Sequence, residues 1–299
     1  MSADGAYRLA VIPGVSLAED SAQSHCFVQV NDGTNGRSAY HRWPLAEFRP
    51  RPGRFCVEVG PNRFSLDGIE LDIDRPEGRC RGRLEFSGVH GWPVRLLAPG
   101  AMGPFRFVPL MECYHGILSF DHRLSGQIEV DGASWDFAGG RGYCEKDWGR
   151  SMPSAWVWLQ CSHLGDAGVS LSASIARVPW AGFSFTGHIV GLWLAGRLVE
   201  FATWNGSRLV ELTVGERAVR FVLERGRARL EVDAERAAGA SLASPEQGAM
   251  SGRISETLGA SVHVKLAEGG TTVFQGEGRF AGLEVVGPAH EMVRAGGEK

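Results

Sequence analysis

Apolar and polar residues alternate along most of the chain, in short runs separated by turns that contain glycine. The clearest runs cover residues 54–59, 79–86, 168–176 and 253–266. A period of two is typical of half-buried β-strands, whereas a helix repeats every 3.6 residues. Almost no 3.6-residue pattern extends beyond two turns. The pattern therefore predicts an all-β protein of antiparallel barrels or sandwiches and argues against an α/β fold.

The turn residues support hairpins between these runs. Asp67-Gly68 and Asp131-Gly132 each separate two strand-like runs, and Asp-Gly favours the tight turn of a β-hairpin. Roughly 16 to 18 strands are expected, enough for two closed antiparallel barrels. We predict one barrel over residues 1–150 and a second over 151–299, joined near Gly149. Because ligand pockets favour barrel mouths and domain interfaces, the join is a candidate site.

Composition narrows the function classes. The 299 residues are 43% hydrophobic, so a substantial core is expected, and the net charge of −3 predicts no nucleic-acid partner. The six cysteines are widely spaced without a CxxC pair, which predicts thiols and no zinc site. The start of the chain lacks a secretory pattern, and no apolar window is long enough for a transmembrane helix. These features predict a cytoplasmic protein.

Residues 139–164 concentrate glycines, charges and tryptophans in one stretch. Glu145, Lys146 and Asp147 are followed by Trp148, and an aromatic strand begins near Trp156. Carboxylates beside indole rings fit an acid held in an apolar pocket. They fit equally a structural role, in which a carboxylate ties a turn to backbone amides, because buried charge clusters often belong to ion-pair networks.

Two further segments are candidates. Glu112 and His115 place an acid and a base inside a mostly apolar run. The structural alternative is a core histidine whose hydrogen bonds are satisfied by Glu112 or a neighbour. Residues 90–107 break the alternation with several glycines and prolines, and long irregular connections in compact domains are often functional.

Several motifs together resemble a known family. The segment 140–149, GRGYCEKDWG, is followed by Pro153, Trp156, Trp158 and Gln160, and resembles the signature of the tocopherol cyclase-like family. Similar segments lie across nearly the whole chain, and they are residues 25–30, 103–105, 111–116, 178–183 and 282–285.

The resemblance implies a fold and a reaction. The fold would be two tandem lipocalin-like β-barrels with a hydrophobic pocket. The reaction would be a cofactor-independent, acid-catalysed ring closure of a prenylated hydroquinone, or a related terpenoid, to a chromanol. An acid protonates the alkene of the prenyl tail, a phenol oxygen captures the tertiary cation, and a base takes the phenol proton. The substrate would be lipophilic, so transient contact with a membrane surface is expected.

The resemblance also suggests roles for residues. Asp147 is the predicted acid and Glu145 the next candidate, while His115 or Glu112 orients the phenol or takes its proton. Predicted substrate contacts are Tyr114, Tyr143, Trp148, Trp156, Trp158 and Gln160, and no metal ligand is expected. A pocket walled by Trp148, Trp156 and Trp158 would raise the pKa of the acid by desolvation. Lys146 opposes this, but an extended segment turns Glu145 and Asp147 to one side and Lys146 to the other.

Two other classes remain open. A lipocalin-like binding protein would hold a lipophilic small molecule in the same pocket without converting it. A carbohydrate-active β protein would use a carboxyl pair and surface tryptophans. A glycosidase needs two carboxyls across one cleft, and Glu145 and Asp147 are too close in sequence to serve alone.

Overall fold

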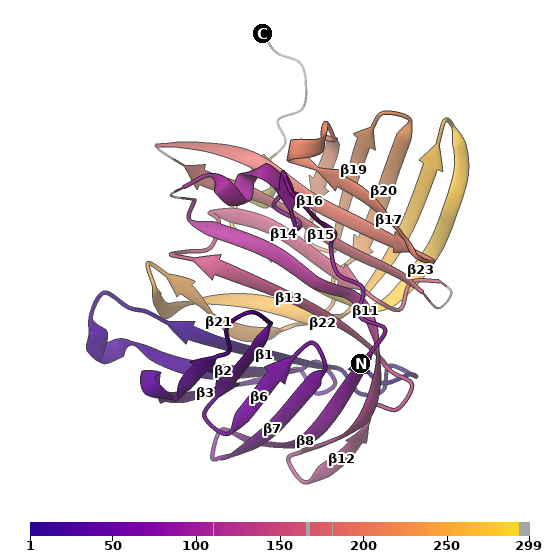
Figure 1. Cartoon of the computed structure of the whole chain (residues 1–299). Helices are drawn as coiled ribbons and strands as arrows, with labels where there is room; N and C mark the ends of the chain where they lie inside the picture. Colours follow the sequence, from indigo (N-terminus) through magenta and orange to yellow (C-terminus); the bar gives the residue numbers. More distant parts are fainter. Residues whose placement is uncertain (110, 166–167, 181, 293–299) are drawn as a thin grey trace. The chain divides into compact units, whose positions relative to one another are not determined.

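The computed structural model describes residues 1–109, 111–165, 168–180 and 182–292 and consists of β-strands and short 3₁₀ helices (Figure 1). The predicted all-β class is confirmed. Contacts divide the chain into two compact units. The first contains Met1–His90, Asp121–Tyr143 and Ala240–Ile254, and the second contains Gly91–Phe120, Cys144–Gly239 and Ser255–Lys299.

The first unit holds a three-stranded sheet, β1-β2-β3, and most of an eight-stranded sheet of order β12-β11-β8-β7-β6-β5-β4, in which β13 also pairs with β11. Its elements are β1 (Leu9–Ser16), η1 (Ser21–Gln23), β2 (His25–Asp32), β3 (Arg37–Pro44), η2 (Leu45–Glu47), β4 (Phe48–Pro50), β5 (Cys56–Val59), β6 (Asn62–Ser65), β7 (Gly68–Arg75), β8 (Gly78–Ser87), β12 (Ala133–Asp136) and β21 (Ala240–Glu246). Three strands contain residues of both units, and they are β11 (Cys113–Val130), β13 (Arg141–Gly149) and β22 (Ala249–Glu268).

The second unit is built on a ten-stranded sheet of order β17-β16-β15-β14-β23-β22-β20-β19-β18, with β21 paired to β22. Its remaining elements are β9 (Val94–Arg95), β10 (Ala98–Pro99), η3 (Gly103–Phe107), β14 (Ala155–Cys161), β15 (Val169–Trp180), β16 (Phe183–Leu194), β17 (Arg197–Ala202), η4 (Thr203–Asn205), β18 (Arg208–Val214), β19 (Ala218–Arg225), β20 (Ala228–Glu235), β23 (Thr271–Val286) and η5 (Ala289–Glu291).

The alternation along β14 separates the two faces of this sheet. Val157 and Leu159 are fully buried in the apolar core of the second unit. Trp156 and Trp158 therefore point to the opposite face, because successive side chains of a strand alternate. Both faces of β14 are covered, since Trp156 is also buried. A strand covered on both faces has room for buried polar side chains only where each finds a partner.

The predicted turn at Asp131-Gly132 is confirmed, because it joins β11 to β12 with φ values of 49° and 88°, which suit a hairpin turn. The prediction of closed barrels is not confirmed. Among the described residues, each large sheet is an open path, ending at β12 and β4 in one and at β17 and β18 in the other. β17 and β18 follow each other in the chain but lie at opposite ends of this sheet path. The short helix η4 separates them, and in it the Asn205 side chain accepts a hydrogen bond from the Ala202 N–H.

The two contact units interleave along the chain, whereas the sequence suggests contiguous halves at 1–150 and 151–299. The domain division and the tandem lipocalin-like arrangement stay predictions. All six cysteines are thiols, and four of them are buried, as expected for small apolar side chains. Within the described ranges, no helix has the length and apolar character needed to cross a bilayer.

Candidate active site

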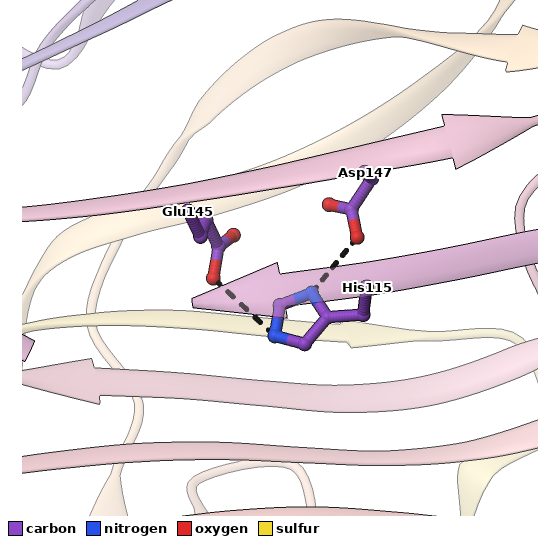
Figure 2. A group of neighbouring side chains, drawn as sticks. All are labelled: His115, Glu145 and Asp147. Atoms are coloured by element: carbon purple, nitrogen blue, oxygen red, sulfur yellow. Dashed lines mark hydrogen bonds and ion pairs between the residues drawn. The ribbon is translucent and has the colours of Figure 1, made fainter. Parts of the chain in front are cut away.

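Three charged side chains meet on β11 and β13, within the second unit (Figure 2). His115 lies on β11, and its Nδ1 is 2.8 Å from Oδ1 of Asp147 on the paired strand β13. Its Nε2 is 3.7 Å from Oε2 of Glu145, so the imidazole ring lies between two carboxylates. The predicted placement of Glu145 and Asp147 on one face of an extended segment is confirmed.

A glycine fixes the register that brings these residues together. Gly149 ends β13 with a φ of +154°, and a Cβ there would lie 2.0 Å from the backbone oxygen of Glu112. The same oxygen accepts hydrogen bonds from the backbone N–H groups of Arg150 (2.8 Å) and Ser151 (3.3 Å). Because only glycine permits this approach, the end of β13 is held against the start of β11. Two residues earlier, Asp147 then lies opposite His115.

The two carboxylates decide the charge of the ring. His115 is only 9% exposed, and burial lowers its pKa. The charges of Asp147 and Glu145 and the hydrogen bond to Asp147 outweigh burial and raise the pKa to about 9. At neutral pH the ring is therefore an imidazolium, and Nδ1–H donates to Asp147. The buried Nε2 has no hydrogen-bond partner among the described residues.

Trp158 holds the second carboxylate in place. Its indole Nε1–H donates to Oε2 of Glu145 at 3.0 Å. The indole has room because residue 282, on the neighbouring strand β23, is glycine; a Cβ there would lie 2.8 Å from the Trp158 ring. The thiol of Cys144 lies next to Glu145 in sequence, and burial, followed by the charge of Glu145, raises its pKa to about 12. This thiol is therefore protonated at neutral pH and is no nucleophile.

Glu284 is a buried acid that the sequence alone did not reveal. Its Oε2 accepts a 2.7 Å hydrogen bond from the indole Nε1–H of Trp156. Glu256 lies opposite it in the β22–β23 ladder and is also buried. Burial first, and then the charge of Glu256, raise the pKa of Glu284 well above its usual range. Glu284 is thus harder to ionise than an exposed glutamate, and Glu256 adds to this because two like charges paired across strands repel.

The sequence pattern of β23 indicates the direction of the Glu284 side chain but not its burial. It interrupts the apolar run of β23 between Leu283 and Val285, which pack with the core of the second unit. Alternation places it on the other face, beside Trp158 in the neighbouring strand. A sequence cannot show that this second face is covered, so Glu284 reads as a solvent-facing residue.

The three side chains of the cluster are also of the types that bind metal ions. One ligand atom from each of His115, Glu145 and Asp147 lies within 4.8 Å of the others, which is compatible with a cation. The shortest contact, from Nδ1 to Asp147, is a hydrogen bond that needs a proton on this nitrogen. A metal-ligating nitrogen must be deprotonated, so Nε2 would be the ligand atom of the ring for as long as Nδ1–H donates to Asp147. Without a cation the cluster is an ion-pair network.

Trp148, one of the tryptophans predicted to surround the acid, lies on the other face of its strand. Trp148 was expected to desolvate Asp147, but it points to the opposite face of β13. Its ring stacks on Tyr114 with centroids 5.4 Å apart, and the ammonium of Lys146 lies 5.0 Å from its centroid. The reason is the alternation itself, which sends Trp148 and Lys146 away from Asp147. Trp148 and Tyr114 are not part of the charged cluster, and their role as substrate contacts stays a prediction.

The other predicted residues are not brought into the cluster by any described contact. Glu112 takes part through its backbone oxygen, as described for Gly149. Gln160 follows Trp158 on the same face of β14, and its amide donates to Oγ of Ser162. Tyr143 is half-buried on β13 and belongs to the first unit. Their predicted roles remain untested.

Comparison with known proteins identifies the family. The model of the family described as "Tocopherol cyclase-like" matches residues 65–287, which include the whole charged cluster and Glu284. The chain belongs to the tocopherol cyclase-like family. The resemblance found in the sequence motifs is thereby confirmed.

Individual tocopherol cyclase-like relatives are distant. Over 173 residues the chain is 25% identical to a protein named "Probable tocopherol cyclase, chloroplastic" from Oryza sativa subsp. japonica and to "Tocopherol cyclase, chloroplastic" from Zea mays. The match covers 50% of this chain but only 37% and 36% of the two plant proteins. Kievitone hydratase from Nectria haematococca has a similar structure, with a TM-score of 0.51, 14% identity and coverage of 95% of this chain and 86% of that chain. This likeness shows a shared fold.

Proposed function

We propose that this chain is a cofactor-independent cyclase of the tocopherol cyclase type, which closes a prenylated hydroquinone or a related terpenoid to a chromanol. The observation that carries the proposal is the buried imidazolium of His115 between the carboxylates of Asp147 and Glu145. Such a cluster stores a proton at neutral pH next to groups that accept one. Ring closure needs both, because it adds a proton to carbon and removes one from oxygen.

Asp147 delivers the proton in this scheme. It shares the proton of His115 Nδ1 across a 2.8 Å hydrogen bond, and its side chain is 36% exposed, which leaves part of the carboxylate accessible. Proton transfer from Nδ1 to Asp147 and on to the alkene forms a tertiary carbocation. The phenol oxygen then bonds to this carbon. The phenol proton returns to the cluster through Glu145 or the imidazole, so the proton count of the enzyme is unchanged after each turnover.

The reaction needs no oxidant or reductant, because the chromanol is an isomer of the substrate. The residues around the cluster suit a cationic intermediate. The faces of indole rings attract cations, and Trp158 lies within hydrogen-bond distance of Glu145. In this scheme the phenol oxygen binds to His115 Nε2, which has no hydrogen-bond partner among the described residues.

An anaerobic incubation of the purified protein with a panel of prenylated hydroquinones, analysed by chromatography and mass spectrometry, tests the proposal. We expect a product of unchanged mass and shifted retention, and an Asp147→Asn variant that forms at least about a hundredfold less of it. The matched control is Asp74→Asn, which alters an exposed carboxylate on β7 that is ion-paired with Arg79. Full activity of Asp147→Asn on a proven substrate would refute the acid assignment.

The second candidate is a binding protein for a lipophilic small molecule. It is favoured by an apolar cavity of about 190 Å³ lined by Phe105, Val108, Met111, Trp180 and Phe185. This lining contains no acid. Tight retention of unchanged ligand by both the wild type and Asp147→Asn would support binding without conversion.

A further inference from the structure

The irregular connection between β8 and β11 exposes apolar side chains that the proposed reaction does not use. β9 and β10 form a hairpin with Leu96 and Leu97 at its tip, and these side chains are 91% and 78% exposed. Val94 before them is 81% exposed, and Phe107 at the end of η3 is 66% exposed. Soluble monomers rarely gather so many exposed large apolar side chains in one short segment.

The tip of the β15–β16 hairpin adds two exposed aromatic side chains near the end of the same connection. Phe183 is 80% exposed there, beside Trp180, its partner in the ladder. The indole of Trp180 donates to the backbone oxygen of Pro109 at 3.2 Å, which joins the hairpin tip to the end of the connection. Phe105 of η3 and Phe185 of β16 also lie with ring centroids 6.0 Å apart. Trp180 also lines the apolar cavity described above. We call the exposed apolar side chains of the two segments the apolar rim, and they are Val94, Leu96, Leu97, Phe107, Trp180 and Phe183.

Two cations flank the apolar rim. Arg106 follows Phe105 in η3, and its guanidinium lies 5.4 Å from the centroid of Trp148, while the Lys146 ammonium lies 5.0 Å from the same centroid. Trp148 stacks on Tyr114, whose hydroxyl donates to the backbone oxygen of Val108 in the cavity lining. Within the described part of the chain, neither Arg106 nor Lys146 takes part in an ion pair.

We propose that the apolar rim docks on an anionic lipid bilayer. Aliphatic and phenylalanine side chains enter the acyl region, tryptophans lie at the headgroup level, and Arg106 and Lys146 face lipid phosphates. This combination of apolar anchors, indole rings and basic side chains is that of membrane-interface proteins. The charges complement an anionic surface, although the whole chain carries a net charge of −3. The inference does not depend on the proposed reaction.

Sedimentation with vesicles of phosphatidylcholine, with or without phosphatidylglycerol, tests the docking. We expect the wild type to sediment with the anionic vesicles and the Leu96→Asp/Leu97→Asp variant to bind at least about tenfold more weakly. The matched control is Leu17→Asp/Val273→Asp, which places two aspartates at other exposed apolar positions and leaves the rim intact. This control should bind like the wild type, and thermal melting checks that both variants are folded.

A second double variant tests the contribution of Arg106 and Lys146 to vesicle binding. Arg106→Gln/Lys146→Gln should weaken binding to anionic vesicles by about tenfold and leave binding to neutral vesicles unchanged. A wild type that does not sediment with either vesicle would overturn the proposal, as would equal binding by the two aspartate variants. Sedimentation velocity adds a further check, because a dimer that Leu96→Asp/Leu97→Asp converts to a monomer would assign the rim to a second copy of the chain.

Discussion

The pKa of His115 reports directly on the charged cluster. It lies about 2.5 pH units above the ordinary value of 6.5, at about 9, although burial lowers it. At about 1.4 kcal/mol per pH unit, the folded structure favours the imidazolium by about 3 kcal/mol. Asp147 supplies the closest charge and the hydrogen bond, so Asp147→Asn removes most of this preference. In this variant Glu145, 3.7 Å from Nε2, offsets the effect of burial on the pKa without the help of Asp147.

We therefore expect the pKa of His115 to fall to about 6.5 or lower in Asp147→Asn, a loss of about 3 kcal/mol. The measurement is a pH titration of the imidazole Cε1–Hε1 signals by NMR. His115→Gln identifies the signal among the nine histidines of the chain. Glu112→Gln is the matched control and should leave the pKa near 9, because Glu112 contacts the cluster region through its backbone. A His115 pKa above 8 in Asp147→Asn would refute the reasoning.

The same change has a signature in stability. A histidine whose pKa is raised on folding stabilises the folded state fully below its unfolded pKa, near 6.5, and this contribution disappears as the pH rises through about 9. The free energy of unfolding of the wild type, measured by chemical denaturation, should therefore fall more steeply between pH 6.5 and 9 than that of Asp147→Asn. Parallel curves for the two proteins would contradict this.

Three further predictions follow from the same geometry. In a pH–rate profile, activity on a proven substrate should fall as the pH rises through about 9, where His115 loses its proton, and a rate that is constant beyond pH 10 would exclude an essential imidazolium. Glu284→Gln should be at least as stable as the wild type at pH 8 by chemical denaturation. The pKa of Glu284 is raised on folding, so above its ordinary pKa of 4.5 the ionisation of this carboxyl destabilises the folded wild type. Strong destabilisation of the variant at pH 8 would show that the ionised form is the native one. Trp158→Phe removes the hydrogen bond to Glu145 and should lower the free energy of unfolding by about 1–3 kcal/mol, whereas an unchanged melting temperature would show that the indole contributes nothing there.

The sequence contained the strand pattern and half of the site. Alternation predicted an all-β fold, and it also placed Glu145 and Asp147 on one face of β13, because side-chain direction in a strand depends only on sequence spacing. The same rule should have moved Trp148 to the opposite face with Lys146. Its closeness to Asp147 in sequence suggests a shared pocket, whereas its position in the strand excludes one.

The rest of the site depends on strand pairing, which a single sequence does not specify. The distance between His115 and Asp147 follows from the register of β11 and β13, which the backbone contact at Gly149 maintains. The pKa of Glu284 is raised because its side chain is buried and Glu256 lies opposite. The expected compartment and the absence of a nucleic-acid partner stay predictions.

The central claim is that an exchangeable proton of the cluster is delivered to a substrate carbon. Ring closure of a prenylated hydroquinone in D₂O, followed by work-up in H₂O and mass spectrometry, tests it most directly. The account predicts a chromanol that carries one carbon-bound deuterium, at the former alkene CH carbon, in the wild type. It also predicts almost no product in Asp147→Asn. A wild-type chromanol without carbon-bound deuterium would contradict proton delivery by the cluster.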